Sequence, residues 1–591
     1  MIRSGKISEQ VVGFARQENA GQVAGLALLP CSRFRNRKAE RDPEVCMGGQ
    51  KKQNNFVLQA GILAASGMIV KVISLIYRSP LLSIIGLEGN GYYSTAINIY
   101  TIILLISSYS IPSAISKVIA QKLAFKEYRN AQRVFQCALA YVLVVGGIAS
   151  VFTFVAAPIL MSNSANSIVA LRVLAPTIFF SGLLGVLRGY FQAHGSMLHT
   201  SLSQILEQIL NATVSILAGY LLIQMVANQS ETTQAVYGSA GSALGTGAGV
   251  VTALLFMFGM YMLNRRTINR RVEHDRTEQV DGYGEIFKLI VTIVTPFILS
   301  TFIYNCSTVV NMDTYYRVIM DYKNVDSVTA HIDYGIFSTQ AIAVVNIPIA
   351  IASAMSSATI PGLATTFVRK EYKKTREQVA KAIRMTMLIA IPASMGLLLL
   401  AKPIMYFIFP QKEALDKASG LLAALSVTVI LYCLSTLTNA VLQGIGRVNT
   451  PVVHSAVALV IQTAGLVALL WFTEWNLYAL ACANIIYSFV MCVLNQISVR
   501  RHLGYKQEVV RTFILPFVSS LVMGVVAYGV YHGLYLLLPV SRIALLAAIG
   551  IGAMIYFAMI LLIGGITEKE LKSFPKGTML VHFAKKLHLL R

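Results

Sequence analysis

Residues 134–157 read VFQCALAYVLVVGGIASVFTFVAA. This run contains no Asp, Glu, Lys or Arg, and as an α-helix rising 1.5 Å per residue it can cross the roughly 30 Å hydrocarbon core of a bilayer. Comparable runs recur from residue 56 to residue 566. The run therefore indicates one transmembrane helix among many.

The composition of the whole chain supports the same class. Of its 591 residues, 55% are hydrophobic and 13% are charged, whereas soluble domains carry about 25% charged residues. This balance excludes a cytosolic enzyme, a secreted disulfide scaffold and a free nucleic-acid-binding protein. The sequence predicts an all-α membrane protein that crosses the bilayer many times.

A window of about 19 residues predicts fourteen spans. They are 56–79, 91–116, 134–157, 168–187, 200–224, 238–263, 286–312, 334–366, 385–400, 418–442, 451–472, 477–498, 512–537 and 542–566. The eighth is long enough to be tilted or bent near Pro348.

The net charge of +23 is a topology signal. Cytoplasmic loops retain Lys and Arg, and an N-terminus inside the cell gives 30 basic residues on cytoplasmic segments after the first span against 6 on outer loops. We therefore expect both termini in the cytoplasm and no nucleic-acid partner.

An internal repeat divides the spans into two halves. Four short motifs recur after 244 to 251 residues: 111–114 and 360–363, 126–128 and 370–372, 157–160 and 402–405, and 190–193 and 441–444. Six spans separate the partners each time, so spans 1–6 and 7–12 have the same orientation, as in transporters with parallel repeats.

The repeat sets the expected domain boundaries. Spans 1–6 form an N-lobe, 53–263, and spans 7–12 form a C-lobe, 286–498, joined by a cytoplasmic linker at 264–288. Spans 13 and 14 occupy 512–566, and 567–591 is a basic cytoplasmic tail. Residues 1–52 are a basic segment too polar to span, and Met47 is an alternative start. In the sixth span, Gly241, Gly245 and Gly249 are expected to pack closely against a neighbouring helix.

Cations at membrane depth are candidates for a substrate site because they are costly there. Lys71 and Arg78 lie seven residues apart in the first span and share one helix face. Facing a cavity, they suit an anionic group such as a diphosphate, to which Arg donates two hydrogen bonds; Arg78 also fits an anchor at the interface. Arg172 and Arg317 are further candidates for this cationic cavity.

Other polar residues have two interpretations each. Glu207 in the fifth span and Asp313 are candidates for an ion site or for pairing with an arginine. Four residues near the cytoplasmic ends of repeated helices form a possible gate or are ordinary positive-inside anchors: Arg188, Gln192, Gln443 and Arg447. No nucleotide-binding, zinc-protease or nucleophile motif occurs at a meaningful position, so no catalytic or metal site is expected.

Several motifs resemble those of the polysaccharide biosynthesis and stage V sporulation protein B group of the multidrug/oligosaccharidyl-lipid/polysaccharide exporter superfamily, which is similar to the MurJ lipid II flippases. These motifs are 61–71, 77–81, 88–93, 111–117 and 188–192. The resemblance covers about residues 50–566. It implies a V-shaped pair of six-helix lobes around a cationic cavity, and two extra helices that line a groove for a lipid tail.

The resemblance also implies the function. The expected activity is alternating-access export of an undecaprenyl-diphosphate-linked sugar precursor, with lipid II favoured, across the bacterial plasma membrane. The family's two first-helix cations map onto Lys71 and Arg78, although the spacing differs by one residue. No cofactor is expected; a monovalent cation or the membrane potential would drive the cycle, and the cell-wall synthesis machinery is the expected protein partner.

Three alternatives remain open. Capsular, teichoic or spore-cortex precursors are other substrates for the same flippase. A multidrug/cation antiporter of the superfamily would need a cavity rich in carboxylates, and the deep charges here are mainly basic. A membrane glycosyltransferase would need acidic residues on a sizeable outer loop, and the longest one, 313–333, is short.

Overall fold

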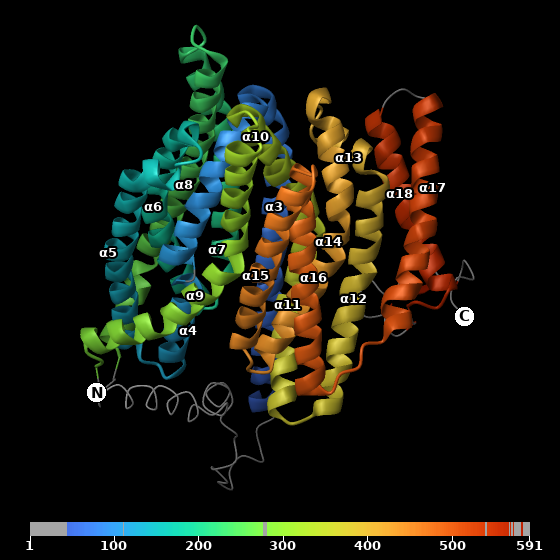
Figure 1. Ribbon diagram of the computed structural model, residues 1–591. Helices are drawn as coiled ribbons and strands as arrows, with labels where there is room; N and C mark the ends of the chain where they lie inside the picture. Colours follow the sequence, from blue (N-terminus) through green and yellow to red (C-terminus); the bar gives the residue numbers. More distant parts are fainter. Residues whose placement is uncertain are drawn as a thin grey trace, which may run out of the picture.

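The computed structural model describes residues 44–109, 111–275, 280–537 and 541–566, with scattered positions between 568 and 585. All regular structure in this part of the chain is helical (Figure 1). Residues 1–43 and most of the tail lie outside the described residues, so the expectations for them stay predictions.

The first half of the fold consists of α3 (Glu44–Leu104), η1 (Leu105–Tyr109), α4 (Ile111–Ala124), α5 (Tyr128–Leu160), η2 (Ala165–Ser167), α6 (Ile168–Ala193), α7 (Met197–Met225) and α8 (Glu231–Glu273). The second half consists of α9 (Tyr283–Tyr316), η3 (Arg317–Tyr322), α10 (Ser327–Gly335), η4 (Ile336–Ala341), α11 (Ile342–Val368), α12 (Tyr372–Leu399), α13 (Ala401–Ile408), α14 (Lys412–Gly444), α15 (Asn449–Phe472) and α16 (Leu477–Leu503). The chain continues through η5 (Val510–Ile514), α17 (Leu515–Leu537) and α18 (Ser541–Leu562).

The predicted all-α transmembrane fold is confirmed. Twelve helices of the described residues are long and apolar enough to cross a membrane. That number treats α3 as one helix, although it contains the expected first span and the start of the second, and it omits α9, which covers the expected seventh. The fourteen predicted spans therefore agree roughly with the helices.

A backbone break inside α3 separates the first two spans. Gly86 has φ +71° and ψ 175°, a conformation that glycine adopts readily and other residues rarely do. The first segment of α3 runs to the upper end of the molecule, and the chain then turns back (Figure 1). Gly86 thus lets two membrane-spanning helices follow each other without a loop.

The internal repeat is visible in the backbone. Lys126 and Lys370, which belong to the repeated motif, have φ values of +63° and +59°. Gly195 and Gly446, which follow the repeated glutamines, have φ values of +77° and +83°. Because a positive φ is uncommon, and unfavourable for lysine, its recurrence at corresponding positions indicates that the two halves repeat one backbone.

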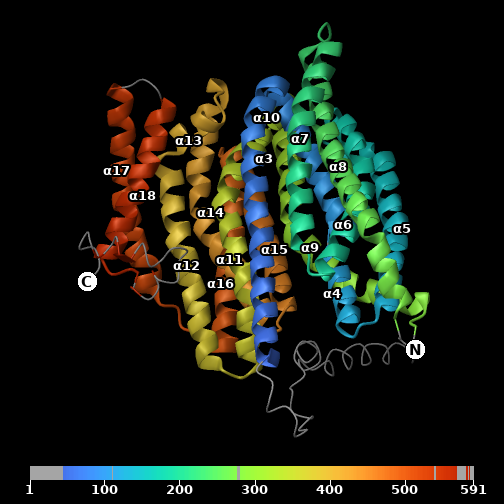
Figure 2. The same ribbon diagram turned by 180° about the vertical axis from the view of Figure 1, so that it is seen from behind.

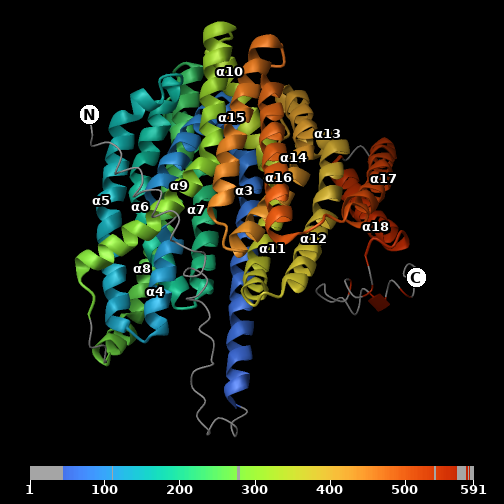
Figure 3. The ribbon, with the colours of Figure 1, turned by 60° about the horizontal axis from the view of Figure 1, so that its bottom comes forward.

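The helices form two groups with an appendix. Figure 1 places α5, α6, α7 and α8 on one side and α11, α12, α14 and α16 on the other, with the dark-blue first part of α3 between them, and Figure 2 shows the same division from behind. Helix α9 contacts α5 on one side and α15 on the other. Helices α17 and α18 pack on each other and on α12 and α13, and they stand at the outer edge (Figure 3).

The glycine stripe of α8 packs against α7, as the sequence predicts. A Cβ atom on Gly241 would lie 2.5 Å from Gly219 Cα, and one on Gly245 would lie 2.5 Å from the backbone nitrogen of Ser215. A Cβ on Gly249 would lie 2.5 Å from the carbonyl oxygen of Glu207. The two helix backbones therefore touch, and no side chain fits at these positions.

Helix α8 extends beyond the expected sixth span. It continues to Glu273, through the first part of the segment that the sequence assigns to the linker. Arg270 and Arg271 lie in its last turn, where cations interact favourably with the helix dipole.

Candidate functional site

A cavity of about 840 Å³ lies between the two groups of helices. Its walls come from α3, α9, the α10–η4–α11 segment, α14, α15 and α16. It extends from Arg78, near the upper turn of α3, to Val448 and Pro451 at the lower end of α15. Most of its wall therefore belongs to the C-lobe.

The cavity is polar but almost uncharged. Its polar lining comprises six asparagines and a glutamine together with serine, threonine and tyrosine hydroxyls, the amides being Asn98, Asn305, Asn311, Asn346, Asn439, Asn484 and Gln443. Among the described residues that line it, Arg78 is the only one with a full charge. Such a surface can hydrogen-bond a large polar group and supply a single positive charge.

Arg78 lies at the upper end of the cavity, where it forms a hydrogen bond with the C-lobe. Its Nη1 atom donates to the carbonyl oxygen of Thr339, 2.9 Å away. Asn90 Nδ2 donates to the Thr339 hydroxyl at 2.6 Å, and that hydroxyl donates to the carbonyl of Gly335. One η4 residue thus receives hydrogen bonds from two α3 side chains, and further guanidinium donors remain for a ligand.

The upper end of the cavity is closed by contact between α3 and the α9–η4 region. We call these residues the upper seal: Asn90, Gly91, Thr95 and Asn98 with Tyr316, His331, Tyr334, Gly335 and Thr339. A Cβ on Gly91 would lie 2.3 Å from the His331 carbonyl oxygen. The Thr95 and Tyr316 hydroxyls lie 2.7 Å apart, and Asn98 Nδ2 donates to Tyr334 Oη at 2.9 Å.

The other cation candidates lie apart from the cavity lining. Lys71 is exposed on α3, about two turns from Arg78 on the same face. Arg172 is exposed on α6, with its guanidinium carbon 5.6 Å from the Phe154 ring centre. Arg317 Nε donates to Asp313 Oδ2 at 2.8 Å, and more than half of the Arg317 side chain is exposed.

The two acidic candidates each meet an arginine. Glu207 Oε2 lies 2.7 Å from Arg188 Nη2, and Arg188 Nε also donates to Ser203 Oγ at 2.9 Å. Asp313 accepts from Arg317 and from Asn163 Nδ2, the latter at 2.8 Å. Both carboxylates therefore have partners in this structure.

The four gate candidates are separated by the fold. Gln443 lines the cavity at the lower end of α14, and Arg447 follows in the exposed loop before α15. Gln192 lies in the last turn of α6 and does not line the cavity. Arg188, one turn earlier on α6, is engaged with Glu207.

The asparagines of the cavity are the functional candidates that sequence reasoning missed. Asn305 and Asn311 lie in the seventh span, Asn439 in the tenth and Asn484 in the twelfth. Amides within apolar runs are a usable signal, since each must be hydrogen-bonded or face a polar cavity. A search of the spans for ionisable residues identified Arg78 but not these asparagines, because an amide side chain carries no charge.

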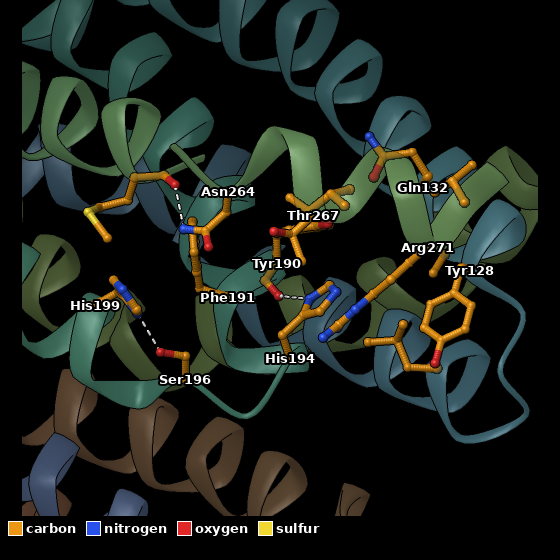
Figure 4. Close-up of a pocket in the computed structure, with 15 residues that line it drawn as sticks. Tyr128, Gln132, Tyr190, Phe191, His194, Ser196, His199, Asn264, Thr267 and Arg271 are labelled. Atoms are coloured by element: carbon orange, nitrogen blue, oxygen red, sulfur yellow. Dashed lines mark hydrogen bonds between the residues drawn. The ribbon is translucent and has the colours of Figure 1, made fainter. Parts of the chain in front are cut away.

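A second cavity of about 350 Å³ lies at the lower end of the N-lobe (Figure 4). It is lined by residues of α4, α5, α6 and α8 with His199 of α7, and it shares no lining residue with the first cavity. The Tyr190 and His194 ring centres lie 4.4 Å apart, and Arg271 lies between His194 and Tyr128 in the close-up. No group of three or more His, Cys, Asp or Glu in the described parts of the chain could hold a metal ion.

Comparison with known proteins relates the chain to one family. The family model described as "Lipid II flippase MurJ" matches residues 113–548. Lipid II flippase MurJ of Bacillus subtilis (strain 168) is 23% identical over 500 residues, 81% of this chain and 88% of that protein. Stage V sporulation protein B of the same organism is 21% identical over 527 residues, 88% of this chain and 98% of that protein.

Solved structures of MATE family transporters share the fold. An inward-facing multidrug resistance MATE family transporter of the MOP superfamily aligns with a TM-score of 0.58 at 16% identity, over 75% of this chain and 98% of that chain. An outward-facing structure of a MATE family transporter aligns with a TM-score of 0.55 at 17% identity, over 76% and 96%. At these identities the likeness concerns the fold alone.

Proposed function

We propose a function on one premise: the chain belongs to the family of the lipid II flippase MurJ, whose model matches residues 113–548. The chain is therefore a multi-pass membrane transporter and not an enzyme. Within this family, we propose that it exports an undecaprenyl-diphosphate-linked sugar precursor across a bacterial plasma membrane, with both termini in the cytoplasm. Lipid II is the precursor that we favour, and stage V sporulation protein B marks a spore-related precursor as the second candidate.

The observation that carries this proposal is the cavity with its single cation. A polar wall with many amides and hydroxyls suits a glycan head group, and Arg78 suits the diphosphate next to it. Lys71, on the same face of α3, would meet the head group on its way into the cavity. The prenyl chain would stay in the lipid beside α17 and α18.

The upper seal supports an alternating-access cycle. In this structure the seal closes the upper end, whereas the cavity lining reaches Val448 and Pro451 at the end where we place the cytoplasm. The head group would enter from that side. The lobes would then rock apart at the upper seal, with the energy taken from a monovalent cation gradient or the membrane potential.

The cavity disfavours the multidrug/cation antiporter among the alternatives. A site for organic cations needs carboxylates, and the residues that line this cavity include no Asp or Glu in the described part of the chain. The one charge is positive. An anionic head group is therefore the better match.

Complementation in a strain depleted of the protein tests this function. We expect an undecaprenyl-linked precursor to accumulate on the inner leaflet, and its chemical identity names the substrate. Arg78→Ala should lower apparent affinity by about ten- to a hundredfold through the loss of a charged contact of about 1.5–3 kcal/mol. Arg78→Lys should fall between wild type and Arg78→Ala, because lysine keeps the charge and loses the planar fork.

A combined variant decides whether the first-helix cations take part. Lys71→Ala with Arg78→Ala should abolish complementation at normal membrane abundance, since removing both charges makes the helix more apolar and leaves insertion intact. Full activity of this double variant would remove both residues from the substrate site. If no lipid-linked precursor accumulates on depletion, the proposed function is wrong.

A further inference from the structure

A hydrogen-bonded chain of side chains runs from behind the C-lobe wall to the cavity. His454 Nδ1 lies 2.7 Å from Asn495 Oδ1, and Asn495 Nδ2 lies 2.7 Å from Asn439 Oδ1. His454 Nε2 lies 3.2 Å from Ser498 Oγ. Of these four residues only Asn439 lines the cavity. These hydrogen bonds thus connect side chains behind the cavity wall to one amide, that of Asn439, on the surface of the cavity.

One backbone carbonyl fixes the direction of both hydrogen bonds that the Asn495 side chain makes within this series. Asn495 is fully buried, and its amide nitrogen also lies 3.4 Å from the carbonyl oxygen of Ser435. A carbonyl only accepts, so the Asn495 atom that faces Ser435 and Asn439 must be its NH₂ group. Its oxygen must then face His454 and accept from the Nδ1–H of that ring.

The orientation of Asn495 decides which atom of the Asn439 amide is available in the cavity. Because Asn495 donates, the Asn439 oxygen is already used as an acceptor. The Asn439 amide nitrogen has no hydrogen bond to any described residue, although its side chain lines the cavity. A donor group, and not an acceptor, is therefore left for a ligand at this position.

We propose that Asn439 is a specificity-determining residue that donates a hydrogen bond to an acceptor oxygen of the uncharged glycan part of the substrate, and that Asn495 and His454 are positioning residues that hold its amide in this orientation. This proposal rests on the proposed function and names the part of the substrate that the C-lobe wall recognises. Arg78 lies near the upper seal, whereas Asn439 lies one turn before Gln443 at the lower end of α14. The charged and uncharged parts of one ligand would thus meet opposite ends of one cavity.

Two amide-to-carboxylate variants test the orientation. In Asn439→Asp, the new carboxylate still accepts from Asn495 and has no donor for the cavity. In Asn495→Asp, the new carboxylate still accepts from His454 and cannot donate to Asn439, so the Asn439 amide should turn and present its oxygen instead. Gln496→Glu is the matched control, because Gln496 neighbours Asn495 on α16 and bonds Gln507 away from the cavity.

The experiment is equilibrium binding to the full-length protein in nanodiscs, with two probes: lipid II and sugar-free undecaprenyl diphosphate. We expect both Asp variants to weaken lipid II binding about tenfold, as the loss of one hydrogen bond predicts, with binding of undecaprenyl diphosphate unchanged. Gln496→Glu should leave both affinities unchanged. A purely structural effect would instead lower thermal stability and weaken both probes equally.

The outcomes separate this inference from the function on which it rests. If Asn439→Asp binds lipid II as wild type does, while wild type prefers lipid II to undecaprenyl diphosphate, the inference is overturned and the flippase function stands. If wild type binds neither probe, both fail. Asn439 is only partly buried, so its variant should fold and decides the question even if Asn495→Asp does not accumulate.

Discussion

In the N-lobe, Arg188 near the lower end of α6 donates to Ser203 and Glu207 of α7. The 251-residue offset that relates Gln192 to Gln443 also relates Arg188 to Asn439 and Ser203 to His454. The corresponding positions of the C-lobe thus carry an amide and an imidazole, linked through Asn495. One backbone fold thus holds an arginine–glutamate pair in the first lobe and a series of amide and imidazole hydrogen bonds in the second.

The same contrast appears at a second pair of positions. In the N-lobe, Lys122 meets Glu127 at 3.0 Å and Asp281 at 2.5 Å. Its repeat mate, 244 residues on, is Thr366, which shares hydrogen bonds with Thr375 and Gln378. At these two pairs of corresponding positions, the N-lobe has ion pairs where the C-lobe has amide, imidazole or hydroxyl side chains, and polar side chains of the C-lobe form most of the cavity wall.

The largest expected effect concerns how each lobe packs its last two helices. Gly245→Val should prevent accumulation of folded protein, because a Cβ would lie 2.5 Å from the Ser215 backbone nitrogen, which cannot move aside. In the C-lobe, a Cβ on Gly465 would meet only the flexible end of Ile486, at 3.0 Å. Gly465→Val should therefore accumulate. Membrane levels and detergent gel filtration measure both, and equal accumulation would break this part of the comparison.

An intermediate effect should come from the charged pair of the N-lobe. Less than a third of the Arg188 and Glu207 side chains is exposed, so losing either partner leaves a poorly solvated charge. Arg188→Leu or Glu207→Leu should each cost about 2 kcal/mol of stability. The double variant should recover most of the lost stability, because it leaves neither charge without its partner.

A double-mutant cycle by thermal unfolding in detergent measures this coupling. Complementation by the double variant would agree with a structural pair. A stable double variant that no longer transports would instead assign Glu207 to an ion site and contradict the division between lobes.

The smallest effect should come from Lys122→Met, below about 1 kcal/mol, because Glu127 keeps its hydrogen bond from Asn130 when the lysine is removed. Burial opposes the charged form of this lysine, but its hydrogen bonds to Asp281 and Glu127 outweigh that effect and raise the pKa of Lys122 above 10.5. The stabilisation should be complete below about pH 10.5 and should fade as the pH rises through the higher folded-state pKa.

Stability against pH, compared with Thr366→Val, checks this prediction. Thr366→Val should lower the free energy of unfolding by an amount that does not depend on pH, because the hydrogen bonds of Thr366 join uncharged groups. If the free energies of unfolding of Lys122→Met and wild type still differ as much above the raised pKa of Lys122 as they do at neutral pH, the lysine charge does not stabilise this cluster.

More of the fold than of the candidate site could be predicted from the sequence, for physical reasons. Apolar runs indicate which residues lie in the bilayer, and basic loops indicate which side of it a segment faces. The spans and the repeat could therefore be predicted from the local sequence. The spans 56–79 and 91–116 placed a connection around Gly86, but the continuation of the helix on both sides of that one residue could not be predicted, because it depends on the backbone angles of Gly86. Arg78 was found because a cation in a span is conspicuous. Asn439 was not, because its meaning depends on Asn495, 56 residues away in the chain.

Photo-cross-linking at the repeated glutamines tests the division of labour most directly. Gln192 and Gln443 occupy corresponding lower ends of α6 and α14, and only Gln443 lines the cavity. A photoreactive phenylalanine analogue at each position, irradiated in membranes that contain radiolabelled lipid II, should capture the label at 443 and not at 192. Equal capture at both positions, or capture at 192 alone, would contradict the account in which the C-lobe wall holds the head group.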